Sequence, residues 1–168
     1  MNRFKILILL LVFASCKDND KNNTNDGTFS YDIKIDGKNY TWSGGIPAPG
    51  LDGQCAYAVN GNVATINLFK GVNPNFSLGG NIPAGIGSFT IDKNSLNADL
   101  GISGFLSRTE NFSVSGGNIL KVTVDKIDSD RYGNVTGSIN GNITIVNTST
   151  FNTREASVVG TFKACKMN

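Results

Sequence analysis

Apolar and polar residues alternate along most of the chain from residue 29 onward. Residues 29–35 carry an apolar side chain at every second position, which is the period of a half-buried β-strand. Asp36-Gly37 follows, and an Asp-Gly pair between two such segments predicts a tight β-hairpin into a second strand at 38–42. The same reasoning predicts strands at 54–60, 63–69, 87–92, 98–103, 111–115, 120–127, 133–140, 141–146 and 156–164. No stretch has a helical period of useful length, so we expect a single antiparallel all-β domain of about ten short strands.

Glycine interrupts the last predicted strands in a regular way. Val135, Ile139 and Ile143 alternate on one face with Gly137 and Gly141, so large and missing side chains follow one another. Glycine inside a strand marks a bend, a bulge or a close approach of two backbones. Curved strands of this kind suit a small barrel or a twisted sandwich, and the pattern does not choose between the two. Two segments rich in Gly and Pro, 44–50 and 79–85, are expected to be loops.

A different pattern occupies the start of the chain. Arg3 and Lys5 precede an apolar run at 6–13, and the small residues Ala14 and Ser15 stand directly before Cys16. A basic start, an apolar middle and small residues at the cleavage point are the layout of a secretory signal peptide. The apolar run is about half of the roughly 20 residues that a membrane-spanning helix needs, so we predict a cleaved signal at 1–15.

The position of Cys16 resembles the bacterial lipobox, although Phe13 stands where Leu or Val is usual. The resemblance implies that diacylglycerol alkylates the Cys16 thiol, that the signal peptide is removed, and that a fatty acid such as palmitate acylates the new amino group. Two or more acyl chains hold a protein firmly at a membrane. The membrane, reached through lipid on Cys16, is therefore the first partner that we expect.

The segment behind the cysteine should be a flexible tether. Residues 17–27 contain no apolar side chain and cannot bury surface, so we expect 16–28 to be a lipidated, disordered linker to a domain at 29–168. Asp18 and Asp20 also resemble the signal that sends lipoproteins of the Bacteroidota to the cell surface. We expect a lipid-anchored protein of the outer membrane that faces the cell exterior, with the periplasmic face as the alternative.

The amino-acid composition excludes several kinds of partner and catalytic site. The net charge is +2 and the Lys and Arg residues are not clustered, so we expect no nucleic-acid partner. The sequence has no histidine, which excludes Ser-His-Asp and Cys-His nucleophilic sites, zinc sites with histidine ligands and haem held by histidine. We predict no catalytic residue, no cofactor and no metal site.

Two cysteines remain for the domain itself. An even pair in an exported chain is most simply a disulfide, because the compartment is oxidising, and we predict one between Cys55 and Cys165. The alternative is two separate buried thiols.

Tyr40 and Trp42 lie two residues apart on one face of a predicted strand. If exposed, the pair could stack on sugar rings or anchor a protein partner, and we treat both residues as candidate ligand contacts. If buried, they are part of the core. The core role is favoured, because a strand near the start of a small domain needs large side chains to hold it against the opposite sheet.

Two sets of acidic residues offer weaker hypotheses. Asp125, Asp128 and Asp130 resemble part of a calcium loop, but the ligand pattern that an EF-hand requires is incomplete, and a polar turn is the preferred interpretation. Glu110 and Glu155, together with the aspartates, could supply a glycosidase pair, yet no local pattern picks out two of these carboxylates.

Several short motifs resemble uncharacterised exported lipoproteins of the Bacteroidota: Ile35-Asp36-Gly37-Lys38-x-Tyr40-x-Trp42, the segment 84–91, and the segments 122–125, 135–139 and 159–162. The resemblance implies an all-β exported domain and brings no catalytic residue with it. The sequence therefore predicts a noncatalytic, lipid-anchored envelope protein with a binding or interaction domain, whose protein or glycan partner it does not identify. The alternatives are a barrel that encloses an apolar or saccharide ligand and, less favoured, a carboxylate-based hydrolase.

Overall fold

The computed structural model describes residues 27–46, 53–70, 76–95 and 100–167. The predicted signal peptide 1–15, Cys16 and the tether up to residue 26 lie outside the described residues. The described residues form an all-β domain, as the alternation predicts. Its eleven strands are β1 (Phe29–Ile35), β2 (Lys38–Gly44), β3 (Gly53–Asn60), β4 (Val63–Lys70), β5 (Phe76–Pro83), β6 (Gly87–Ile91), β7 (Gly101–Phe105), β8 (Glu110–Ser113), β9 (Leu120–Ile127), β10 (Asn134–Asn147) and β11 (Thr153–Lys166).

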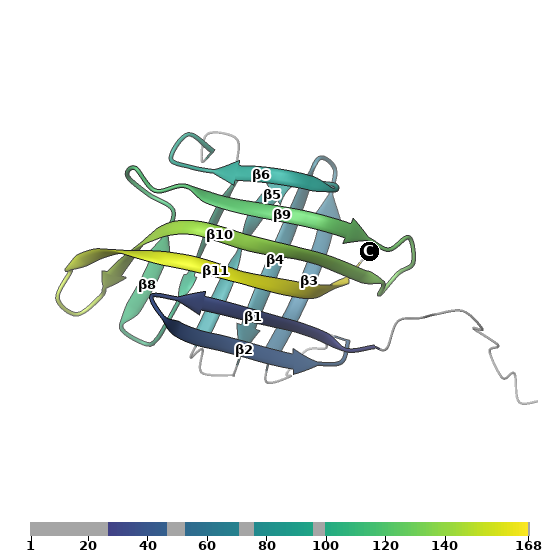
Figure 1. Cartoon of the computed structure of the whole chain (residues 1–168), viewed down its shortest axis with the longest axis horizontal. Coiled ribbons are helices and arrows are strands. Elements are labelled where there is room, and N and C mark those ends of the chain that lie inside the picture. The colour runs from purple at the N-terminus through teal and green to yellow at the C-terminus, as the bar shows by residue number, and fades with distance from the viewer. Residues whose placement is uncertain (1–26, 47–52, 71–75, 96–99, 168) are drawn as a thin grey trace, which may run out of the picture.

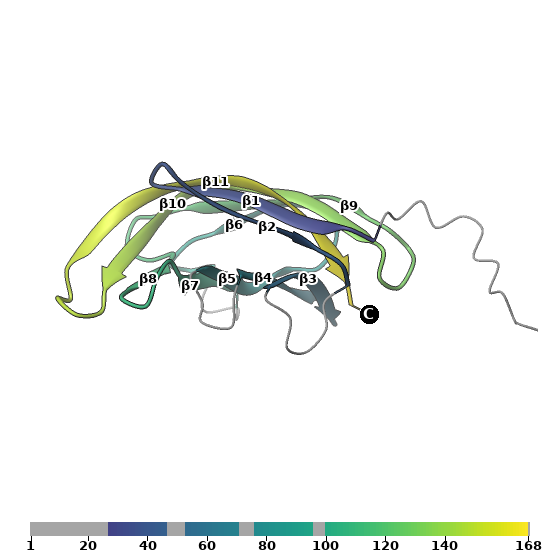
Figure 2. The same cartoon turned by 90° about the horizontal axis from the view of Figure 1, so that it is seen from below.

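The strands form one mostly antiparallel sheet that folds over into two layers (Figure 2). The outer layer has the order β2-β1-β11-β10-β9-β6, and the inner layer has the order β3-β4-β5-β7-β8. Figure 1 shows the outer layer in front, with β2 and β6 at its two edges. Two stacked layers joined in this way make a twisted sandwich and not a closed barrel, which decides between the two architectures that the sequence left open.

The long strands β10 and β11 connect the two layers. β11 pairs with β1 from Val158 to Lys163, and its end then turns to the inner layer, where Cys165 pairs in parallel with Ala56 of β3. In the same way, β10 pairs first with β9 and then, from Thr144 onward, with β8. Gly141 lies where β10 leaves β9, and a Cβ there would stand 2.1 Å from the Ile119 carbonyl oxygen. The bend therefore needs glycine, in line with the curvature predicted from the glycine pattern.

The predicted alternation of large and absent side chains also explains how β1, β10 and β11 pack. Phe162 of β11 pairs with Gly137 of β10, and a Cβ on Gly137 would stand 2.5 Å from the Phe162 ring. Ile33 of β1 pairs with Gly160 of β11 and covers it in the same manner. Each glycine thus makes room for a large neighbour on the adjacent strand.

Local turn chemistry fixes the first hairpin. β1 and β2 pair from Phe29↔Gly44 to Ile35↔Lys38, which leaves Asp36 and Gly37 as a two-residue turn. Both turn residues have positive φ, 51° and 82°, which is the type I′ geometry that an Asp-Gly pair favours. The prediction of this hairpin is confirmed residue by residue.

Two sequence predictions of elements are wrong. The segment 79–85 was expected to be a loop, but most of it belongs to β5, which pairs with both β4 and β7. The backbones of β5 and β7 approach closely at Gly80, where a Cβ would lie 1.8 Å from the Gly101 carbonyl oxygen. Glycine therefore suits this position of the strand. The predicted strands 133–140 and 141–146 are a single strand, β10, which bends at Gly141 without ending.

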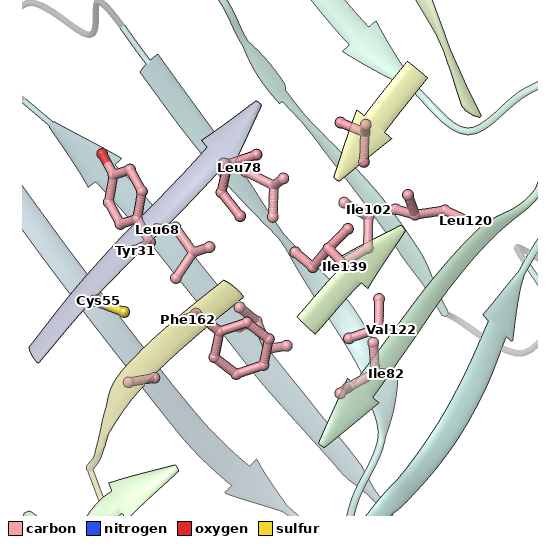
Figure 3. Packing of buried hydrophobic residues seen from close by; sticks show 14 of the residues in the cluster. Tyr31, Cys55, Leu68, Leu78, Ile82, Ile102, Leu120, Val122, Ile139 and Phe162 are labelled. Atoms are coloured by element: carbon pink, nitrogen blue, oxygen red, sulfur yellow. The ribbon is translucent and has the colours of Figure 1, made fainter. Parts of the chain in front are cut away.

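The space between the layers is filled by one cluster of buried apolar side chains (Figure 3). Its members include Ile33 from β1, Leu68 from β4 and Ile139 from β10, each with no exposed surface. Within the described part of the chain, no helical segment has the length and apolar character that a membrane crossing requires.

Candidate functional site

One cleft of the domain lies over three neighbouring strands at one edge of the outer layer. It has a volume of about 660 Å³, within the range of small-molecule sites. Its lining consists of three consecutive residues from each of β1, β2 and β11, namely 30–32, 41–43 and 161–163, together with Lys70 of β4. Figure 1 shows these three strands side by side, with β2 outermost. We call this site the main cleft.

Strand alternation sorts the lining residues into two sets. Tyr31, Trp42 and Phe162 pair across the three strands and turn toward the core. The residues on either side of them turn to solvent, because successive side chains point to opposite faces of a sheet. The solvent-facing set is polar throughout: Ser30, Asp32, Thr41, Ser43, Thr161 and Lys163.

Lys70 reaches the main cleft from the inner layer. Its Nζ lies 3.5 Å from the carbonyl oxygen of Thr41, to which it donates a hydrogen bond. Because β2 is an edge strand, this contact places a positive charge against the open edge of the sheet, which is a common protection against pairing with another chain. Lys70 also lines a second, smaller space of about 210 Å³, the side cleft, together with Lys38, Asn39, Tyr40 and Phe76.

Tyr40 and Trp42, the candidate ligand contacts from the sequence, are half-buried and pack against the core. The Tyr40 ring lies 4.7 Å from that of Phe76, and the Trp42 ring is stacked 6.3 Å from that of Tyr31. Trp42 also covers Gly44 and Gly53, where any Cβ would stand less than 2.5 Å from the indole ring. Both side chains therefore help to hold β2 in place, as the core interpretation requires.

Tyr31 carries the one unsatisfied group next to these clefts. The residue is only 3% exposed and lines both clefts, and its hydroxyl has no hydrogen-bond partner among the described residues. Burial, with a smaller contribution from the nearby Cys55 thiol, raises the pKa of Tyr31 above its usual range. The phenol is therefore neutral, and its oxygen is buried on the core side of β1.

The predicted disulfide between Cys55 and Cys165 is not present, and this corrects the sequence interpretation. Both residues are free, fully buried thiols. The register gives the reason: Cys165 pairs with Ala56, one residue away from Cys55, and adjacent residues of a strand point to opposite faces. The Cys55 thiol lies 3.2 Å from the Ser30 carbonyl oxygen, and burial raises the pKa of Cys55 to about 12 and that of Cys165 to about 11.

The acidic residues after β9 form a turn. One Asp128 oxygen accepts a hydrogen bond from the backbone N–H of Asn134, and the other lies 2.7 Å from the Lys126 ammonium. These two contacts, the Lys126 one first, lower the pKa of Asp128. The described residues contain no group of three or more His, Cys, Asp or Glu side chains that could hold a metal ion. The carboxylate of Asp128 thus closes the β9–β10 connection.

Glu110 and Glu155 do not form a pair. Glu110 lies beside Asn147 and Glu155 beside Thr144 in the sheet register. Because these β10 positions are three residues apart, the two glutamates lie on opposite faces of the sheet. Glu110 instead contacts Arg154, which also binds Asp36 at the β1–β2 turn.

A further cleft, of about 720 Å³, opens near the β6 edge of the sandwich. Buried Ile91, Ile102 and Val114 contribute to its lining, with Asp92 as its only carboxylate among the described residues. The described lining of the main cleft likewise contains a single carboxylate, Asp32. In neither cleft do the described residues bring together the two carboxylates that a glycosidase uses.

The sequence analysis singled out Tyr40 and Trp42 but missed the polar residues around them. Lys70 could not be found, because its place depends on the contact between the two layers. The hydroxyl residues of β1 and β2 were visible as the polar positions of the alternating strands, but alternation alone makes them a solvated face. Only the strand order shows that three such rows lie side by side.

Comparison of the chain with known protein families, with curated proteins and with solved structures finds no match.

Proposed function

We propose that this chain is a noncatalytic, lipid-anchored protein of the cell envelope whose β-domain binds a ligand in the main cleft. The observation that carries the proposal is the composition of that cleft. Three adjacent strands supply four hydroxyl side chains at its solvent-facing positions, with two lysines and a single carboxylate beside them. Such a lining can donate and accept many hydrogen bonds, but its described residues include neither a nucleophile with its base nor a carboxylate pair.

The amino terminus supports the location. The basic, apolar and small-residue layout of 1–15, followed by Cys16, is that of a lipoprotein signal. Acyl chains on Cys16 would tether the domain to the outer membrane, where the acidic residues that follow the cysteine favour the outward-facing leaflet. We propose that the domain meets its ligand there.

The rival proposal of a ligand enclosed in a barrel has less support. The sandwich is not a closed barrel, and buried side chains fill the space between its layers. An apolar ligand could still enter the cleft near β6, so the experiment must separate the two clefts.

A filled-cleft variant tests the proposed function. We expect oligosaccharides from a test panel to bind to the full-length protein in detergent, and titration calorimetry measures this binding. Thr161→Tyr adds a large side chain inside the main cleft and should abolish that binding. Thr90→Tyr makes the same change at an exposed position of β6, on the same layer but outside the cleft, and should leave it intact. Binding that survives Thr161→Tyr, or is lost equally with Thr90→Tyr, would contradict the proposal.

A further inference from the structure

The charges of the clefts point to a narrower ligand class. The main cleft and the side cleft adjoin each other, because Tyr31, Thr41 and Lys70 line both of them. Lys38 joins this site on the side of β2, and Lys163 joins it on the side of β11. Asp32 is the only acidic residue among the described residues that line the two clefts, where three lysines against one aspartate give a net charge of +2. A ligand with carboxylate or sulfate groups would meet complementary charge here.

Lys70 is well placed to meet such a group. Its ammonium lies at the boundary between the two clefts, and its hydrogen bond to the Thr41 carbonyl is long, at 3.5 Å. The side chain is exposed, and a charged acceptor makes a stronger hydrogen bond with an ammonium than a neutral carbonyl does. An anionic group can therefore replace the Thr41 oxygen as the partner of Lys70.

The remaining polar groups favour a sugar over other anions. Ser30, Thr41, Ser43 and Thr161 present hydroxyls that can donate to and accept from the hydroxyls of a sugar ring. No arginine is among the described residues that line the two clefts, whereas phosphate and nucleic-acid sites favour the bidentate guanidinium.

We infer that the main cleft and the side cleft together bind an acidic saccharide, one that carries carboxylate or sulfate groups on hydroxyl-bearing rings. The inference rests on the proposed function and deepens it. Lys70 contacts the acidic group, with Lys38 and Lys163 on either side of it, and the hydroxyl rows of β1, β2 and β11 contact the ring.

Matched probes test this inference on the full-length protein in detergent. We expect trigalacturonate or a sulfated heparin tetrasaccharide to bind, and neutral galactotriose to bind at least tenfold more weakly. The affinity for the acidic probe should fall as salt is raised, because the cleft is exposed to solvent. Lys70→Gln should weaken acidic binding by about fivefold, a typical effect of one exposed charge contact, with little change for the neutral sugar. Lys121→Gln on β9, an exposed lysine of the same layer outside the clefts, should change neither.

The outcomes separate this inference from the proposed function. Equal binding of neutral and acidic probes that Thr161→Tyr abolishes would overturn the charge inference and leave the proposed function standing. Loss of affinity in Lys121→Gln as large as in Lys70→Gln would also overturn it, because the attraction would then be general. Tighter binding of a single-stranded oligonucleotide than of either acidic saccharide would assign the cleft to another polymer. Failure of every saccharide to bind would remove both proposals.

Discussion

Trp42 shows how a single side chain determines the position of an edge strand. The indole ring packs against Tyr31 and covers two glycines, Gly44 at the end of its own strand and Gly53 at the start of β3. It therefore joins the outer layer to the inner layer at a place where no backbone pairing connects β2 to β3. The main cleft depends on this contact, because β2 forms one of its walls.

We predict that Trp42→Ala lowers the free energy of unfolding by about 3 kcal/mol, the lower end of the range for large aromatic residues, because the side chain is half-buried. Chemical denaturation followed by circular dichroism measures the change. Trp42→Phe keeps a ring over the glycines and should cost less. A stability for Trp42→Ala equal to that of the wild type would show that the ring does not hold β2.

The two buried cysteines allow a second test at the scale of single residues, namely whether their thiols are free. In the Cys16→Ala protein, Cys55 and Cys165 should resist alkylation near neutral pH while the protein is folded, because both are buried and burial raises their pKa values to about 12 and 11. After unfolding without reductant, mass spectrometry should show two alkyl groups. Alkylation that required prior reduction would mean that the two thiols form a disulfide.

At the scale of elements, local signals determined what the sequence could predict. β1 and β9 match their predicted bounds, because each alternates cleanly and ends at turn residues. β5 was missed, because Gly79, Gly80 and Pro83 are locally typical of a loop and only the neighbouring backbones of β4 and β7 make them a strand. The candidate site was predictable only to the same extent. The polar residues of each strand that lines the main cleft could be identified from the sequence. That β2, β1 and β11 lie side by side could not, because β1 and β11 pair through residues far apart in the chain.

A substitution of Gly80 tests whether close backbone packing makes this segment of β5 a strand. We predict that Gly80→Ala destabilises the domain by about 1–3 kcal/mol or more, because the added Cβ would collide with the Gly101 carbonyl and push β5 away from β7. Gly117→Ala is the matched control, since nothing lies within 4 Å of the Cβ that it adds. Thermal unfolding of both variants measures the difference. Equal melting temperatures would contradict the close approach of the two strands.

At the scale of the whole molecule, the fold places the main cleft near the amino-terminal end of the domain. The lining residues 30–32 follow directly after Phe29, where β1 begins and where the segment from Cys16 joins the domain. The thirteen residues 16–28 span at most about 45 Å when fully extended. A lipid on Cys16 would therefore keep the cleft within that distance of the membrane, where it would meet glycans of the cell surface.

The proposed location of the domain depends on the attachment of lipid to Cys16, which we propose, and one measurement tests that attachment most directly. The full-length protein and its Cys16→Ala variant are produced in cells fed a labelled fatty acid, and the membrane and soluble fractions are compared. We predict that the wild type carries the label and remains with the membranes until detergent is added, because two or more acyl chains hold firmly. The variant should be unlabelled and soluble. A Cys16→Ala protein that fractionates with the membranes at the wild-type level would contradict the lipid anchor, and with it the proposed place of this domain in the cell.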